Sequence, residues 1–313
     1  MAMHELRLQR SDPGWPAALR EIPDPPGRLH LRGALAADFV AGRPWPAAIA
    51  VVGARDATAY GLAVARDLGR CLAENGVAVV SGLAVGIDGA AHRGALEAGG
   101  ITLAVIGCGT DIVYPRPHAR LREDILATGL VLGEHEPGTP ALPHHFPQRN
   151  RILSALALGV IVVEATQRSG SISTARHALE QGREVFAVPG PINSPRSRGP
   201  HALLKQGARL VEGVEDVLAE LPTLRSAHLQ AGTAAAPGPA PAAPRHAAIV
   251  EALASGASTP DAIALYLGRE VREILGDLLD LELRGTILRG PAGGFAAAPQ
   301  GRGWTHGQKR GRD

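Results

Sequence analysis

The sequence is poor in lysine, cysteine and aromatic residues, and each shortage excludes a class of protein. The only lysines, Lys205 and Lys309, lie outside any GxxxxGK[ST] loop, which argues against a P-loop nucleotidase. The two cysteines, Cys71 and Cys108, form neither a metal-binding pattern nor a disulfide framework. Aromatic residues make up 3% of the chain, so the core must consist mainly of alanine, valine, leucine and isoleucine.

The sequence also lacks long apolar runs and a strong charge of either sign. No run approaches the roughly 18 residues of a membrane-spanning helix, and the first residues contain no apolar segment typical of a secretion signal. We therefore expect a cytoplasmic protein without a membrane partner. The net charge is +2, so a nucleic-acid site must be local. Arginine provides all but two of the 32 basic residues, which favours bidentate phosphate contacts but also fits a GC-rich genome.

The chain divides into a large unit and a small one. Residues 48–221 alternate short apolar runs such as AIAVVG and GVIVVEA with stretches of helical character, which predicts an α/β fold with a doubly wound, mainly parallel sheet. Residues 245–298 contain three helical runs followed by a short hairpin, the order of a winged-helix domain. Around these units we expect a Pro-rich N-terminal arm at 1–47, an Ala/Pro linker at 222–244 and a disordered basic tail at 299–313.

Four turns that follow predicted strands carry glycine, serine or arginine. In an open α/β sheet, ligands bind beyond the carboxyl ends of the strands. Each turn alone is explained by tight packing, but the four together, with Arg149 and Arg151 nearby, favour phosphate binding at helix N-termini. The turns lie at 53–55, 81–84, 107–109 and 169–171.

Familiar nucleotide and catalytic motifs are missing. The glycines of GARDATAYG are eight residues apart and do not form GxGxxG, and neither GxSxG nor HExxH occurs. We therefore expect no catalytic residue, no cofactor and no metal. Asp88 and Glu164 lie near strand ends, and we expect Asp88 to cap a helix and Glu164 to hold an arginine. Acid–base chemistry is the alternative, and it requires that the two carboxylates meet. His144 and His145 are adjacent on an expected loop but have no carboxylate at metal-ligand spacing.

Phe146 is one of only four phenylalanines and lies three residues before Arg149, with Pro143 and Pro147 close by. A core position is the ordinary explanation for a phenylalanine. An aromatic ring flanked by arginine is also typical of a stacking platform for single-stranded bases, which we favour here. Residues 144–176 carry four arginines against one glutamate, so the positive charge that the whole chain lacks is concentrated in this stretch.

Seven segments of the chain, in this order and spacing, resemble the DNA processing protein A family, also called DprA or Smf. The resemblance extends from about residue 12 to about residue 221, and the unit at 245–298 is similar to the small winged-helix domain of many members. No segment is specific alone, but together they are highly specific. They are VVGARDATAYG at 51–61, SGLAVGIDGAAHRGAL at 81–96, AVIGCGTDIVYP at 104–115, FPQRNRIL at 146–153, IVVEA at 161–165, SGSISTA at 169–175 and VFAVPGPI at 185–192.

The resemblance implies an extended Rossmann-like domain that binds single-stranded DNA in a basic pocket, and a homodimer. It implies a recombination mediator in natural transformation, which protects incoming strands and helps load the RecA recombinase, without catalytic activity. The family's base-stacking aromatic corresponds to Phe146, and Arg116 occupies a position that is often lysine in other members. The residue pattern adds Ser81 and Gly82 as DNA-binding candidates. The phosphate contacts that the resemblance implies are Arg55, Arg149, Asn150, Arg151, Ser169, Gly170, Ser171 and Thr174.

The sequence departs from the family pattern in two places. Many members begin with a helical domain of several tens of residues that is not found here, so any role of that domain is not expected. Some members carry a basic residue just before FPxRNR, where this chain has Pro143. His144 and His145 stand beside it, which predicts weaker or more pH-sensitive binding.

The winged-helix unit is acidic, with five arginines against seven aspartates and glutamates over 245–298. DNA readers neutralise phosphates, so we expect the presumed recognition helix at 269–283 to contact protein rather than duplex DNA. This charge also disfavours a sequence-specific regulator. The other alternative is a nucleotide hydrolase of the phosphoribohydrolase type, which carries a PGGxGTxxE box. The corresponding turn here, SGSISTARHALE, has no glutamate at that position.

Overall fold

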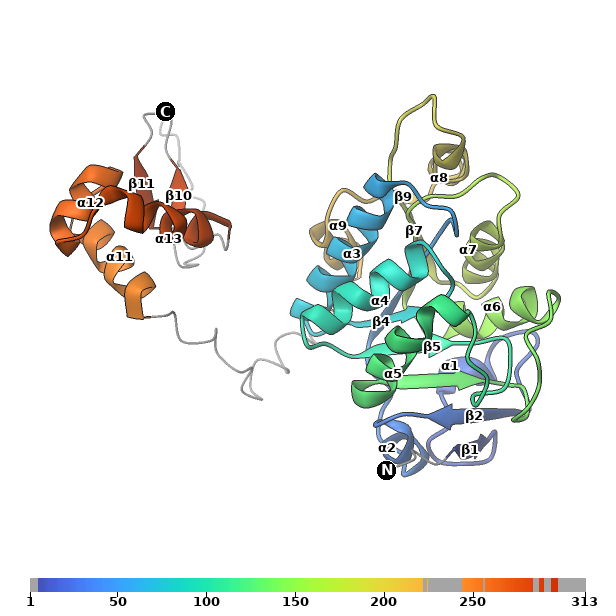
Figure 1. Ribbon diagram of the computed structural model, residues 1–313. Helices are drawn as coiled ribbons and strands as arrows, with labels where there is room; N and C mark the ends of the chain where they lie inside the picture. Colours follow the sequence, from blue (N-terminus) through green and yellow to red (C-terminus); the bar gives the residue numbers. More distant parts are fainter. Residues whose placement is uncertain are drawn as a thin grey trace, which may run out of the picture. The chain divides into compact units, whose positions relative to one another are not determined.

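The computed structural model describes residues 5–221, 224, 244–255, 257–283, 287–289 and 294–297. The chain forms two compact units, Met1–Ala234 and Ala235–Asp313 (Figure 1). The boundary falls inside the segment expected to be a linker. Almost all of that linker and the whole of the expected tail lie outside the described residues, so both remain expectations.

In the described part of the chain, the larger unit contains a nine-stranded sheet with the order β1-β2-β6-β5-β4-β3-β7-β8-β9 (Figure 1). From β3 to β9 the neighbouring strands are parallel, which confirms the predicted doubly wound α/β class. The chain runs from β3 outward to β6 and then returns to place β7 on the other side of β3. The strands are β1 (Leu6–Gln9), β2 (Arg28–Arg32), β3 (Ala48–Val52), β4 (Ala78–Ser81), β5 (Thr102–Val105), β6 (Leu130–Gly133), β7 (Gly159–Val162), β8 (Glu184–Ala187) and β9 (Arg209–Leu210).

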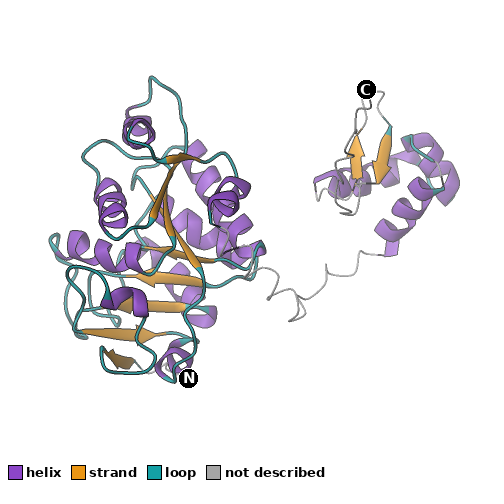
Figure 2. Cartoon of the chain, turned by 180° about the vertical axis from the view of Figure 1, so that it is seen from behind, coloured by secondary structure: helices purple, strands orange, loops and turns teal. Residues whose placement is uncertain are grey.

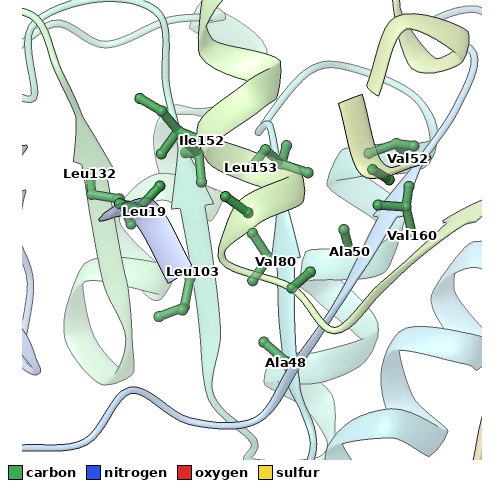
Figure 3. Packing of buried hydrophobic residues seen from close by; sticks show 14 of the residues in the cluster. Leu19, Ala48, Ala50, Val52, Val80, Leu103, Leu132, Ile152, Leu153 and Val160 are labelled. Carbon is green, nitrogen blue, oxygen red and sulfur yellow. The ribbon is translucent and has the colours of Figure 1, made fainter. Parts of the chain in front are cut away.

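The strands β3 to β7 are buried along their whole length and consist mainly of apolar residues, because both faces of the sheet are covered by helices. Successive residues of β3 point to opposite faces, as the period of a strand requires. Ala48, Ala50 and Val52 pack in one buried cluster with residues of α6 and α7 (Figure 3). Ile49 and Val51 pack in a second cluster, with residues of α3 and α4.

The helices of the larger unit connect these strands and hold the segments that form the site. Helix α3 begins after Thr58, whose hydroxyl accepts a hydrogen bond from the backbone N–H of Gly61. The helices are α1 (Ala17–Arg20), α2 (Ala36–Val40), α3 (Ala59–Glu74), α4 (Ile87–Glu97), α5 (Ala119–Thr128), α6 (His145–Ala155), α7 (Gly170–Glu180), α8 (Arg198–Lys205) and α9 (Val214–Glu220), with short 3-10 helices at Arg116–His118 and Pro195–Ser197.

Residues 5–47 do not form the extended arm that the sequence predicts for 1–47. Strand β2 pairs antiparallel with β6, with Leu31 opposite Leu132, and β1 pairs with β2 at the edge of the sheet. Trp15 and Phe39 are buried in the same core cluster as Ala48, Ala50 and Val52 of β3. The prediction was wrong because alternating leucines in two short strands bury enough apolar surface to add them to the sheet, despite the many prolines around them.

In its described residues the smaller unit has three helices followed by an antiparallel hairpin, which confirms the winged-helix order (Figure 2). Its core contains Ile249, Ile263, Ile274, Leu278 and Phe295. None of the helices in the described ranges is both long and apolar enough to cross a bilayer. The elements are α11 (Pro244–Ala254), α12 (Pro260–Leu267), α13 (Val271–Leu283), β10 (Ile287–Arg289) and β11 (Phe295–Ala297).

Candidate functional site

A cavity of about 380 Å³ lies at the carboxyl ends of β3 and β7, where the strand order reverses. Its walls are the loop after β3, the first turns of α6 and the turn that leads into α7. Ligands of open α/β sheets bind at such a reversal, because the loops leave the two strands on opposite sides. Eight of the predicted binding residues line it: Arg55, Phe146, Arg149, Asn150, Ser169, Gly170, Ser171 and Thr174.

The N-terminus of α7 faces this cavity with uncommitted donors. Ser169 is the N-cap residue, but its hydroxyl makes no cap hydrogen bond and instead contacts the hydroxyl of Ser171 at 2.6 Å. Within the described ranges, the backbone N–H groups of Gly170 and Ser171 have no protein acceptor. A Cβ at Gly170 would meet no atom within 4 Å, so the turn is open on this side. Free N–H groups and the helix dipole make this turn suited to an anion.

Arg149 and Asp88 are two buried side chains of the cavity lining whose charges act on each other. Arg149 is 5% exposed and its guanidinium donates to the backbone carbonyl of Val105, while Asp88 is 7% exposed. The Asp88 carboxylate accepts the backbone N–H of Gly82 at 3.1 Å and that of Ala84 at 3.4 Å. It therefore holds the loop after β4 and does not cap a helix.

Burial raises the pKa of Asp88, and the positive charge of Arg149 opposes that rise. Burial also lowers the pKa of Arg149 to about 10, with the attraction of Asp88 acting in the other direction. Arg149 is therefore still charged at neutral pH. It contributes positive potential to the cavity from inside the protein rather than as a free surface side chain.

Arg55 is the exposed cation of the cavity. It follows β3, and its guanidinium carbon lies over the Phe146 ring, 5.5 Å from the ring centroid. The neighbouring Asp56 pairs with Arg196 at 2.5 Å. No carboxylate among the described residues forms an ion pair with Arg55. Arg55 is thus available to an anion that enters the cavity.

Phe146 is neither a core residue nor an open platform. Its half-buried ring packs against Tyr114, with centroids 5.4 Å apart and planes inclined by 35°, while Arg55 lies over it. A second pocket of about 40 Å³ adjoins the cavity and is lined by Arg55, Tyr114, Cys108 and Phe146 among others. Tyr114 was not among the predicted site residues, although an aromatic beside Pro115, in a chain with few aromatics, is a signal that could have found it.

Asn150 joins α6 to α7, and Thr174 braces the first turn of α7 from within that helix. The Asn150 amide donates to the carbonyl of Gly170 at 3.2 Å, and the Thr174 hydroxyl donates to the same carbonyl at 3.4 Å. The Asn150 contact fixes the first turn of α7 relative to α6, and the Thr174 contact lies within α7. The two side chains therefore hold the open N–H groups of that turn in place.

Arg151, a predicted phosphate contact, does not line the cavity. Its guanidinium pairs with Glu134 at 2.7 and 2.8 Å and with Asp24 at 2.9 Å. Burial alone would lower the pKa of Arg151, but hydrogen bonds and the charges of Glu134 and Asp24 raise it above its ordinary value. Arg151 therefore ties α6 to the N-terminal segment and to the loop after β6.

Three further predicted residues lie outside the larger cavity. The Ser81 hydroxyl is buried and donates to the carbonyl of Val51 at 2.6 Å. Gly82 lines the smaller pocket, where a Cβ would lie 2.5 Å from a terminal nitrogen of Arg149. Arg116 is exposed on the short helix that follows Pro115 at the rim of that pocket.

Glu164 does not hold an arginine, as the sequence suggested. Its carboxylate accepts the backbone N–H of Thr58 at 2.9 Å and the Thr58 hydroxyl at 2.6 Å. It also leaves no room for a side chain at Gly61. Glu164 therefore anchors the start of α3 and with it the loop that carries Arg55.

His144 and His145 lie at the start of helix α6 rather than on a loop. The His145 ring stacks on His135 with centroids 3.9 Å apart, and His144 meets it edge-on at 4.5 Å. Burial and the neighbouring His145 lower the pKa of His135. Among the described residues, no group of three or more His, Cys, Asp or Glu side chains is arranged so that it could hold a metal ion. His135, His144 and His145 are therefore not arranged as a metal site.

Two protein-family models match this chain. One, described as DNA recombination-mediator protein A, matches residues 7–222, and the other, described as DprA winged helix domain, matches residues 233–293. Protein Smf of Escherichia coli is 42% identical over 286 residues, which cover 89% of this chain and 74% of that protein. The putative DNA processing protein DprA of Mycobacterium tuberculosis is 45% identical over 264 residues, covering 80% of this chain and 67% of that protein.

Two solved structures share the fold of this chain. DNA processing protein A from Streptococcus pneumoniae has a TM-score of 0.64 and 44% identity, and the match covers 69% of this chain and 74% of that one. DNA processing protein A from Helicobacter pylori, described with its single-stranded DNA binding mode, has a TM-score of 0.61 and 30% identity. That match covers 71% of this chain and 97% of the Helicobacter pylori chain.

Proposed function

We propose, from the premise that the chain belongs to the DNA recombination-mediator protein A family, that it binds single-stranded DNA at the cavity between β3 and α7. One observation carries the proposal: the uncommitted N–H groups of Gly170 and Ser171 lie in the same cavity as Arg55 and Phe146. Donors for a phosphate thus stand beside an aromatic ring for a base. The single-stranded DNA binding described for the Helicobacter pylori neighbour supports the same assignment.

The arrangement favours holding a strand over converting it. Of the carboxylates that line the cavity, Asp56 is paired with Arg196, and Asp88 is buried and accepts the backbone N–H groups of Gly82 and Ala84. Glu164 is engaged by Thr58. Each carboxylate therefore has a structural partner, and we propose a binding protein rather than an enzyme.

The family description names a recombination mediator, and the proposal specifies that role further. We propose that the chain protects incoming single strands in the cytoplasm during natural transformation and helps to load the RecA recombinase. We also propose a homodimer as the working form. Sedimentation of the purified chain checks the dimer, and strand exchange by RecA on protein-coated single strands checks the loading.

The first test is a fluorescence titration of labelled oligo-dT and its duplex counterpart at several salt concentrations. We expect binding that prefers the single strand and weakens as salt rises, because phosphate contacts release counterions. Equal affinity for both forms, or none for either, would contradict the proposal. In that case the release of free base from nucleoside monophosphates would test the hydrolase alternative.

Removal of the smaller unit is expected to leave DNA binding largely intact. Asp277 of α13 is already paired with Arg269 at 3.3 Å, and the unit is acidic overall. A chain that ends at residue 221 should keep its affinity for oligo-dT within about tenfold, equivalent to about 1.4 kcal/mol. The same titration measures this, and a larger decrease would assign DNA contacts to the winged helix.

Replacement of Arg151 by alanine is expected to affect stability and not DNA binding. The side chain is 11% exposed and pairs with Glu134 and Asp24, so its removal should lower the free energy of unfolding by roughly 1–3 kcal/mol. Affinity for oligo-dT should change less than about twofold, since Arg151 does not reach a phosphate in the cavity. Urea unfolding and the DNA titration measure the two effects. Arg120→Ala, at an exposed arginine paired with Asp124, is the matched control.

A further inference from the structure

Arg55 lines both the larger cavity and the smaller pocket of the site. It lines the 380 Å³ cavity, where the α7 N-terminus supplies N–H groups, and also the adjoining 40 Å³ pocket. Phe146 is likewise shared by the two. The Arg55 guanidinium carbon lies 5.5 Å from the centroid of the Phe146 ring. This contact therefore lies where the larger cavity meets the smaller, aromatic pocket.

The smaller pocket suits the face of a base but is too small to hold one. Its lining includes Val85, Ile106, Cys108 and Tyr114, and burial raises the pKa of the Cys108 thiol to about 11, so the thiol is uncharged at neutral pH. A volume of about 40 Å³ holds only a few water molecules. The Arg55 guanidinium lies over one face of the Phe146 ring, so a base can stack on that face only when Arg55 moves.

Electrostatic interactions favour a movement of the Arg55 side chain when an anion enters the cavity. Its positive charge and that of Arg149 repel each other, and this repulsion, after burial, helps to lower the pKa of Arg149. Arg55 has no carboxylate partner among the described residues. A phosphate in the cavity would relieve the repulsion and offer Arg55 a charge-assisted hydrogen bond, which is stronger than an exposed cation–π contact.

We propose that Arg55 and Phe146 form an exchange pair: a phosphate draws the guanidinium off the ring, and an unpaired base of the same strand takes its place. This inference rests on the proposed single-strand binding and specifies how the site recognises a nucleotide. The ligand is a phosphate followed by an unpaired base, and neither part alone gains the full interaction. A base held in a duplex cannot turn into the pocket, so the exchange also favours single strands.

The test uses two labelled strands of equal length, oligo-dT and a strand whose sugar units carry no base, with fluorescence anisotropy at one low salt concentration. Phe146→Leu keeps apolar packing against Tyr114 but removes the aromatic face. For oligo-dT it should weaken binding by about tenfold, because base stacking is removed. For the abasic strand it should tighten binding by about two- to fivefold, because Arg55 no longer leaves a cation–π contact. Tyr266→Leu, at an exposed tyrosine of the smaller unit, should change neither affinity.

The reverse exchange is tested with Arg55→Ala. On oligo-dT with a neutral methylphosphonate backbone, this variant should bind more tightly than wild type, because the ring is uncovered and the ligand carries no phosphate charge for Arg55 to bind. Weaker or unchanged binding of the abasic strand by Phe146→Leu would overturn the exchange and leave Phe146 as a structural support. Failure of wild type to bind oligo-dT at all is a separate outcome, which rejects the proposed function itself.

Discussion

Arg149→Met is expected to lower the free energy of unfolding by about 3–5 kcal/mol, because it removes the buried positive charge that acts on the buried Asp88 carboxyl. Methionine fills much of the same volume, so the decrease reports the charge rather than a cavity. The carbonyl of Val105 is also left without its donor. Urea unfolding at neutral pH measures the change, and affinity for oligo-dT should fall with it, since the loop after β4 depends on this pair.

The decrease should depend on pH in a defined direction. Burial raises the pKa of Asp88 in the folded protein, and removal of Arg149 should raise it further. A carboxyl whose pKa is raised on folding destabilises the protein above that pKa, and the penalty disappears as pH falls and the group is protonated. The stability deficit of Arg149→Met should therefore be largest near pH 8 and shrink toward pH 4. Adding Asp88→Asn should recover part of it at neutral pH, and a deficit that is equal with and without Asp88→Asn would mean that the two charges are not coupled.

Arg55→Ala is expected to weaken oligo-dT binding by roughly 10- to 100-fold, since it removes a charge-assisted interaction from a site whose other arginine is buried. The effect should be similar for all base sequences, because a phosphate contact carries no sequence information. The slope of log affinity against log salt should become shallower by about 0.7 for each phosphate that the variant no longer neutralises. Arg55 is exposed, so the unfolding free energy should change little.

The measurement is the same titration at several salt concentrations for wild type, Arg55→Ala and the control Arg120→Ala. An unchanged salt slope together with a weaker affinity would mean that Arg55 affects the binding of the base and does not contact a phosphate. An unchanged affinity would place the phosphate elsewhere on the surface. Arg120 is a suitable control because it is 89% exposed and lies on α5, away from the residues that line the cavity.

Several features of this protein could be predicted from local pattern. The continuous apolar runs of β3 to β8 indicate strands buried on both faces, and the connecting helical stretches require the parallel order that the structure has. The SGS turn predicts an open helix N-terminus, and Gly170 and Ser171 provide it. The order of three helices and a hairpin, which the described part of the smaller unit has, follows from the sequence in the same way. All of these depend on neighbours within a few residues, which periodicity and turn chemistry describe well.

The roles of individual charges depended on the packing of distant segments. Arg149 and Arg151 are two positions apart in one motif, and on helix α6 such positions face nearly opposite sides. One is buried beside Asp88, and the other pairs with Glu134 and Asp24 far away in sequence. Local pattern was therefore enough to predict the parallel sheet, the open turn before α7 and the supply of arginine. Which arginine faces the cavity, and what covers Phe146, could be known only from the folded chain, because a side chain's direction is set by all the elements that pack around its helix or loop.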